Sequence, residues 1–161
     1  MGNSANVLVG VAVLSIRYPV GGAWREIGYT EDGVTMAYNV TKTEIRVEEE
    51  TYPIAQALES EDIKITANLA ESALQDLHVA MAGATLAGST LSFGGGTDKV
   101  LSVSLVGTNP SGFARTITIP LAVASGSVSM SYRRNEKTIV PVEFTALKGV
   151  GDLCTIVDAT A

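Results

Sequence analysis

Alternation of apolar and polar residues with a period of two is the feature that most constrains the fold of this chain. Residues 101–105 show it most clearly, because Leu101, Val103 and Leu105 alternate with two serines. Successive side chains of a β-strand point to opposite faces of a sheet, so this pattern predicts a strand with one buried face. The expected strands cover residues 7–18, 34–47, 63–69, 101–105, 116–119, 140–144 and 154–157. The sequence therefore predicts a mainly β fold.

Glycine and proline positions predict where these strands turn or end. Residues 19–22 and Glu31-Asp32-Gly33 are expected to form turns, because glycine tolerates positive φ and Asp can bond to its own backbone. Pro120 is expected to end its strand. Pro141 cannot donate a hydrogen bond to a neighbouring strand, so its strand is predicted to lie at a sheet edge or to carry a bulge there.

A single helix is predicted at about residues 72–82. Ser72 and Gln75 have the spacing of a capping box, and Gly83 suits a left-handed helix C-cap. The apolar stripe of this helix consists of Leu74, Leu77, His78 and Met81. A helix of about ten residues is too short to be stable alone, so it is expected to lie against the sheet.

The domain organisation predicted from the sequence is simple. The chain has no internal repeat and no shift in composition, so residues 1–161 are predicted to form a single domain. Two segments lack either periodicity and are expected to be long connections. These are residues 48–61, which are acidic at both ends, and residues 83–98, which are rich in glycine and serine.

The net charge of −6 is unevenly distributed along the chain. Residues 1–80 carry a net charge of −7 and residues 81–161 a net charge of +1. This asymmetry favours head-to-tail stacking of copies, although ordinary loop composition explains it equally well. Only Arg133, Arg134 and Lys137 approach a basic cluster, which makes this acidic chain a poor candidate for gripping nucleic acid.

The sequence offers few residues from which to build a catalytic or metal site. His78 is the only histidine and Cys154 the only cysteine, so neither a zinc site nor an intrachain disulfide is expected. We interpret His78 as a packing residue of the helix, and the acidic runs at residues 48–50 and 59–62 lack the spacing of a calcium loop. Gly94-Gly95-Gly96-Thr97 lacks the order of a phosphate-binding loop. We therefore predict no enzyme activity, no metal and no cofactor, leaving open only an active site shared between subunits.

Targeting signals are also missing from the sequence. No stretch approaches the roughly 20 apolar residues of a membrane span. Residues 1–16 lack the basic start and the cleavage pattern of a secretion signal. The chain is expected to stay in a reducing cytoplasm or to be released by lysis, without membrane insertion.

Three stretches of the chain together resemble the tail tube proteins of long-tailed bacteriophages. Residues 27–34 (IGYTEDGV) are similar to that family's turn into its early strand. Residues 63–77 (IKITANLAESALQDL) are similar to its strand leading into an acidic helix start and a single helix, and residues 142–147 (VEFTAL) to its closing strand. Their order and spacing extend the resemblance over most of residues 5–158. The same family is related to the tube proteins of contractile injection systems.

The resemblance implies a β-sandwich or half-barrel flanked by one helix, with a structural role in the virion. Six copies would close a ring by joining strands edge to edge, completing a larger barrel. The rings would stack into a hollow tail tube through which phage DNA is delivered to the host. The implied partners are other copies of the chain, the tape-measure protein and other tail proteins, while DNA passes through the lumen without specific binding. Assembly would take place in the host cytoplasm.

In that family the long loop after the early hairpin reaches an adjacent ring, which implies an oligomer interface in the matching segment. Its expected residues are Glu48, Glu49, Glu50, Tyr52, Pro53, Ile54 and Leu58. The alternative is an arm that folds back over its own sheet. An acidic, small polar lining would repel the phosphate backbone and let DNA slide, because phosphate affinity along the wall would slow it. The residues expected to face the lumen are Thr66, Asn68, Ser102, Ser104, Thr116 and Thr118.

Other interpretations stay open on the sequence. A ring protein of the tail terminator or baseplate, or the tube of a contractile injection system, would share the fold, and long helical tubes would favour the tail tube over a single ring. A monomeric β-sandwich that binds sugar or protein would usually expose an aromatic platform. Trp24 is the only tryptophan, and we interpret it as a packing residue.

Overall fold

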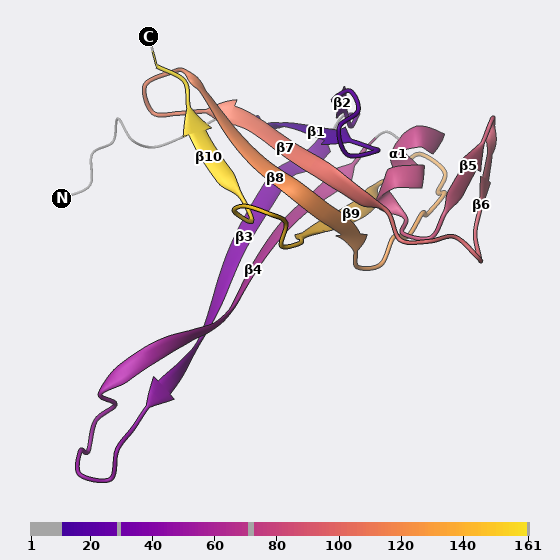
Figure 1. Cartoon of the computed structure of the whole chain (residues 1–161). Helices are drawn as coiled ribbons and strands as arrows, with labels where there is room; N and C mark the ends of the chain where they lie inside the picture. Colours follow the sequence, from indigo (N-terminus) through magenta and orange to yellow (C-terminus); the bar gives the residue numbers. More distant parts are fainter. Residues whose placement is uncertain (1–10, 29, 71–72, 161) are drawn as a thin grey trace.

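The dominant feature of the fold is one large antiparallel sheet (Figure 1). The structure is a computed structural model that describes residues 11–28, 30–70 and 73–160. Its strands are β1 (Val13–Arg17), β2 (Arg25–Glu26), β3 (Thr30–Ile45), β4 (Ala55–Leu69), β5 (Thr85–Ala87), β6 (Thr90–Ser92), β7 (Val100–Thr108), β8 (Ala114–Ser125), β9 (Val140–Ala146) and β10 (Thr155–Asp158). The sheet has the order β2-β1-β7-β8-β9-β4-β3, and β10 pairs with β8. Strands β5 and β6 form a separate two-stranded hairpin.

One face of this sheet carries the hydrophobic core. The register keeps apolar residues opposite one another from strand to strand. Leu14 of β1 lies opposite Leu105 of β7, and Ile65 of β4 lies opposite Phe144 of β9. Phe144 and Ile65 expose no surface, and Leu77 of helix α1 (Leu74–Ala80) packs into the same cluster. The predicted fold class, a mainly β sandwich or half-barrel with one flanking helix, is confirmed within the described residues.

The helix is shorter than predicted, and its caps differ. Its N-cap is Ala73, which makes no side-chain cap hydrogen bond, so the predicted capping box does not start the helix. Ser72 itself lies outside the described residues. The helix ends at Ala80 with Met81 as C-cap, and the ammonium of Lys99 donates to the Met81 carbonyl at 3.0 Å. This contact provides the positive charge that a helix C-terminus favours. Gly83, although at φ +73°, is not the cap, because it lies two residues beyond Met81.

The buried face of the helix also differs from the predicted stripe. Leu77 is buried, but Leu74 is 39% exposed, and His78 and Met81 are only half-buried. Val79, Ala80 and Asp76 are buried instead. Asp76 can be buried because Arg25 of β2 forms an ion pair with its carboxylate. The ion pair with a residue outside the helix allows Asp76 to be buried, which a count of apolar residues could not predict.

Two predicted strand interruptions are β-bulges. Asp32 (φ 59°) and Gly33 (φ 80°) adopt the expected positive φ, but they sit inside β3, where the register with β4 shifts between Glu31 and Val34. Pro120 does not end its strand, because β8 continues to Ser125 past a register shift with β7. A bulge inserts an extra residue without ending the strand, which is why turn residues can occur there. The prediction for Pro141 is wrong, because β9 lies between β8 and β4 in the sheet and has no register shift with either strand. Pro141 is tolerated there because it pairs with Asn68 of β4, whereas the pairing of β9 with β8 involves only residues 143–146.

The two predicted connections contain regular structure. Residues 55–61 belong to β4, which leaves residues 46–54 as the loop between β3 and β4. Residues 83–98 include the β5–β6 hairpin beside α1. The predicted first strand is observed as β1 from Val13, and residues 7–10 lie outside the described residues. Among the helices that the structure describes, none is long and apolar enough to cross a membrane.

Candidate assembly interface

The distal half of the β3–β4 hairpin projects away from the rest of the molecule (Figure 1). We call residues 39–62 the arm. Its two strands pair from Asn39 opposite Asp62 to Ile45 opposite Ala55. Every residue from 39 to 61 is exposed except the half-buried Pro53. The alternative prediction, an arm folded back over its own sheet, is therefore wrong for the isolated chain.

The arm carries apolar side chains that its own fold leaves exposed to solvent. Tyr52 is 79% exposed, Ile54 is 56% exposed and Leu58 is 55% exposed. Val40, Ile45 and Val47 are each more than one-third exposed as well. Single exposed apolar residues are common on protein surfaces, but a group of them on a protrusion marks an interaction surface.

The arm also holds most of the net negative charge of the chain. Residues 39–62 contain seven acids and two bases, a net charge of −5 out of −6 for the whole chain. Arg46 pairs with Glu44 at 2.7 Å, and the Thr43 hydroxyl donates to Glu59 Oε2 at 2.8 Å. The run Glu48-Glu49-Glu50 lies in the exposed loop at the tip. The arm is therefore an acidic surface interspersed with apolar side chains.

The residues predicted for the oligomer interface all lie on the arm. Glu48, Glu49, Glu50, Tyr52, Pro53 and Ile54 fall in the tip loop, and Leu58 lies on β4. Chain segments on both sides of the tip are thus brought together on one protrusion. Their participation in contacts between copies stays a prediction.

The residues predicted to face a lumen share one face of the sheet but differ in exposure. The register of β4, β9, β8 and β7 places all six on the face opposite the core. Thr66 is exposed, and Asn68, Thr116 and Thr118 are half-buried, so these four stay candidates. Ser102 and Ser104 are only 0% and 8% exposed, and their assignment to a lumen is wrong.

Local packing explains why Ser102 is buried. The Ser102 hydroxyl donates to the Pro120 carbonyl at 2.7 Å, at the bulge between β7 and β8. Arg17 of β1 covers Ser102 and donates to its hydroxyl at 3.2 Å, while its guanidinium lies 4.8 Å from the ring centre of Trp24. Alternation predicts the face of a strand on which a residue lies, but not what covers that face. No local pattern signalled Arg17 as the covering residue.

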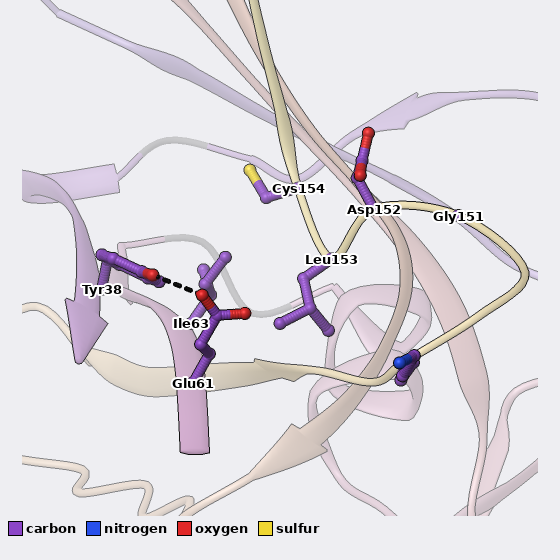
Figure 2. Close-up of a pocket in the computed structure, with 8 residues that line it drawn as sticks. Tyr38, Glu61, Ile63, Gly151, Asp152, Leu153 and Cys154 are labelled. Carbon is purple, nitrogen blue, oxygen red and sulfur yellow. Dashed lines mark hydrogen bonds between the residues drawn. The ribbon is translucent and has the colours of Figure 1, made fainter. Parts of the chain in front are cut away.

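A groove at the base of the arm was not predicted (Figure 2). Its volume is about 410 Å³, and it is lined by Tyr38, Glu61, Ile63, Lys148 and residues 151–154. The Tyr38 hydroxyl donates to Glu61 Oε1 at 2.8 Å, and this bond to the carboxylate raises the pKa of Tyr38. No local sequence pattern signals the groove, because the groove joins β3 and β4 to a loop nearly a hundred residues later in the chain.

The groove lacks the chemistry of a nucleophilic site. Burial raises the pKa of the Cys154 thiol, and a nucleophilic thiol needs a lowered pKa. His78 does not line it: this residue packs edge-on against Tyr18, with ring centres 5.8 Å apart, in agreement with its predicted packing role. Burial is the main cause that lowers the pKa of His78, followed by Lys99 and Arg25. Within the described residues, no three His, Cys, Asp or Glu side chains are grouped to hold a metal ion.

Comparison with known proteins identifies the fold. No protein-family model matches the sequence, and no curated protein matches it. Among solved structures, this chain is similar to a chain from the tail of an empty gene transfer agent particle, a structure refined with helical and C6 symmetry. The TM-score is 0.57 and the sequence identity 10%, over 99% of this chain and 100% of that chain. A chain of the six-fold symmetrised anti-feeding prophage baseplate has a TM-score of 0.55 and 13% identity over 98% of this chain and 97% of that chain. A chain of the native gene transfer agent virion has a TM-score of 0.52 and 10% identity over 99% and 100% of the two chains. The chain therefore has, over nearly its whole length, the fold of proteins from phage-like tails and from the baseplate of a contractile-injection-like particle.

Proposed function

We propose that this chain is a structural subunit of a phage-like tail, and that its copies polymerise as stacked rings into a hollow tube through which DNA is delivered. The observation that carries this proposal is the exposed arm projecting from a tail-protein fold. A protrusion with exposed apolar side chains is stabilised when it docks on another chain. Rings of six are proposed because two of the similar structures have six-fold symmetry.

The sheet edges support ring formation. Strand β3 spans 16 residues and lies at the end of the strand order, with β4 as its neighbour. Its outer edge presents backbone N–H and C=O groups that another strand can pair with. Strand β2 lies at the opposite end of the same order. Edge-to-edge joining of copies would pair these groups and close a ring around a lumen.

The polar sheet face is the proposed lumen wall. Thr66, Asn68, Thr116 and Thr118 remain on it after the two buried serines are removed. These four short uncharged side chains offer phosphate groups no strong contact, and Lys64 on the same face is paired with Glu143, so DNA would pass without specific binding. The same lumen would hold the tape-measure protein before DNA passage.

A ring protein of a baseplate is the second candidate, because a baseplate chain is among the similar structures. The two functions differ in the number of rings. A tube protein stacks many identical rings, whereas a baseplate ring protein stops after one or a few.

Negative-stain electron microscopy of the purified chain tests the proposal. The matched variant replaces residues 46–54 by Asn-Gly, which can join Ile45 to Ala55 as a two-residue hairpin turn because these residues pair directly. We expect long hollow tubes from the natural chain, and rings or monomers of unchanged melting temperature from the variant. Single rings from the natural chain would favour the baseplate function. Monomers alone, even with tail tips added as seeds, would contradict both functions.

A further inference from the structure

We propose that the arm of one copy docks on a basic loop at the opposite end of the next copy. The basic loop comprises residues 127–139 of the connection between β8 and β9. This inference rests on the proposed function, since stacked rings repeat such a contact along the tube. It adds the receiving surface and the residues that recognise the arm.

The basic loop carries a net positive charge, opposite to the net negative charge of the arm. It contains three bases and one acid, in contrast to the seven acids and two bases of the arm. Arg133 and Glu136 form an isolated β-bridge that folds the loop into a tight turn, and Arg134 lies exposed at this turn. Asn135 completes the turn with φ +69°. The loop is thus a shaped basic surface.

Apolar side chains accompany the charges on both surfaces. Tyr132 of the loop is 79% exposed, equal to Tyr52 of the arm. Met130 and Ile139 of the loop are 38% and 37% exposed. Aromatic anchors surrounded by complementary charges are typical of protein interfaces, with the charges giving specificity and the anchors most of the affinity. This combination favours a protein partner over nucleic acid.

Apart from the isolated Lys148 and from Lys42 on the arm itself, which are exposed, most other basic residues of the described chain are less available to an acidic partner. Arg25 pairs with Asp76, Lys64 with Glu143 and Arg115 with Asp158. Lys99 is 6% exposed. Within the loop, Arg133 bonds Glu136 at 3.4 Å and Lys137 bonds Glu31 at 2.7 Å, while Arg134 has no ion pair with a described residue. Arg134 is therefore the central contact that we assign to the arm.

The arm and the basic loop lie at opposite ends of the same hairpin. Val140, directly after the loop, pairs with Leu69 at the far end of β4, and the Lys137–Glu31 ion pair holds the loop beside the start of β3. The arm tip begins at Ile45 and ends at Ala55, the other ends of these two strands (Figure 1). Fourteen residue steps separate Ala55 from Leu69, which spans about 45 Å of extended strand.

This separation makes the contact heterologous. The tip of an arm cannot reach the basic loop of its own chain across that distance, so the two surfaces can meet only between copies. A contact between two different surfaces repeats with each added copy and generates an open stack. The orientation of the hairpin then sets the tube axis, with the acidic end of one ring facing the basic end of the next.

Charge exchange between the two surfaces tests the inference. The loop variant carries Arg133→Glu and Arg134→Glu, and the arm variant carries Glu48→Lys, Glu49→Lys and Glu50→Lys. We expect each to form tubes at least ten-fold more slowly than the natural chain, and a chain with all five changes to recover most of the rate. The matched control is Lys148→Glu, which reverses one exposed charge outside the loop and should leave the rate unchanged. The inference would be overturned if the loop variant formed tubes at the natural rate, or if the chain with all five substitutions recovered none of the lost rate.

Disulfide trapping gives a second readout that does not require tubes. In a Cys154→Ser background, Glu50→Cys and Arg134→Cys are combined and the protein is oxidised. We expect covalent dimers and longer ladders, because positions 50 and 134 of one chain are too far apart to join. The control pair combines Glu50→Cys with Lys148→Cys and should give only background dimers. Equal yields from both pairs would refute the docking, whether or not tubes form. Trapping without tubes would contradict the proposed function alone.

Discussion

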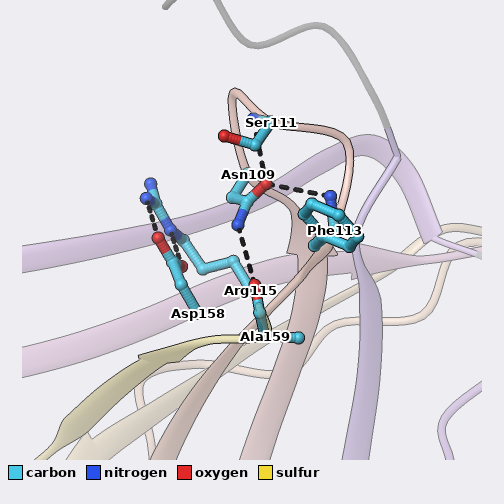
Figure 3. Close-up of polar contacts among 6 residues, drawn as sticks. All are labelled: Asn109, Ser111, Phe113, Arg115, Asp158 and Ala159. Atoms are coloured by element: carbon cyan, nitrogen blue, oxygen red, sulfur yellow. Dashed lines mark hydrogen bonds and ion pairs between the residues drawn. The ribbon is translucent and has the colours of Figure 1, made fainter. Parts of the chain in front are cut away.

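Arg115 of β8 and Asp158 of β10 face each other in a two-point ion pair (Figure 3). Arg115 Nε lies 2.6 Å from Asp158 Oδ1, and its Nη2 lies 2.7 Å from Oδ2. Asn109 holds the same end of the sheet: its amide oxygen accepts from the Ser111 and Phe113 backbones at 3.0 and 2.9 Å, and its amide nitrogen donates to the Ala159 carbonyl at 3.5 Å. Strand β10 pairs over only four residues, so these contacts decide how firmly it is held.

We predict that Asp158→Asn loosens β10 without unfolding the chain. The hydrogen bonds from Arg115 hold the pKa of Asp158 below its usual range. A carboxylate with a lowered folded-state pKa stabilises the fold above its unfolded pKa of about 3.9, and this contribution is lost as the pH falls through the folded value. Amide hydrogen exchange in residues 155–158 should therefore be constant from about pH 7 to 5 and rise below about pH 4, after correction for the intrinsic pH dependence. In Asp158→Asn the same amides should exchange faster already at pH 7, and equal protection in the two proteins would contradict the role of the pair.

Arg25→Met should destabilise the whole domain, because it leaves the carboxylate of Asp76 buried without its cation. Asp76 is 3% exposed, whereas the Arg25 side chain is 37% exposed. Removing one partner of a fully buried pair costs about 3–5 kcal/mol, and we expect about 2 kcal/mol here because Arg25 keeps contact with water. Urea unfolding measures the difference.

The control for this pair is the double variant Arg25→Met with Asp76→Leu, which removes both charges. It should recover most of the lost stability, since replacing both members of a buried pair by apolar groups is often neutral. A double variant less stable than Arg25→Met would mean that the pair itself, rather than the orphaned carboxylate, sets the cost.

The sequence predicted those elements whose signal is local. Strands with one buried face were found from their alternation, including β7 and β9. Residues 55–61 were missed as part of β4 because Leu58 is their only large apolar residue, which leaves no apolar face to recognise. The acidic and apolar arm tip was predicted from the resemblance to tail tube proteins. The groove of Figure 2 and the burial of Ser102 beneath Arg17 were not predicted, because both depend on segments distant in sequence. A local pattern carries no information about such contacts.

Gly96→Ala tests a close approach between two loop backbones. A Cβ at residue 96 would lie 1.9 Å from the carbonyl oxygen of Gly83. Backbone atoms cannot yield as a flexible side chain does, so we expect a loss of about 1–3 kcal/mol in the free energy of unfolding. The control is Gly107→Ala in β7, where the new Cβ would meet only the Ala12 side chain at 3.9 Å. A thermal melt in which Gly96→Ala is as stable as this control would refute the tight contact.

Lysine substitutions distinguish the buried positions of the polar sheet face from the exposed ones. Ser102→Lys places a charge where the side chain is 0% exposed, so we expect a loss of more than about 3 kcal/mol. Thr66→Lys changes an exposed position on the same face and should shift stability by less than about 0.5 kcal/mol. Because the second variant is expected to fold normally, it also tests the proposed lumen. A ring of added lysines would attract phosphate and slow DNA ejection, more at low salt than at high salt. Tubes of Thr66→Lys that deliver DNA at the natural rate at low salt would remove Thr66 from the lumen wall, while leaving the covered position of Ser102 untouched.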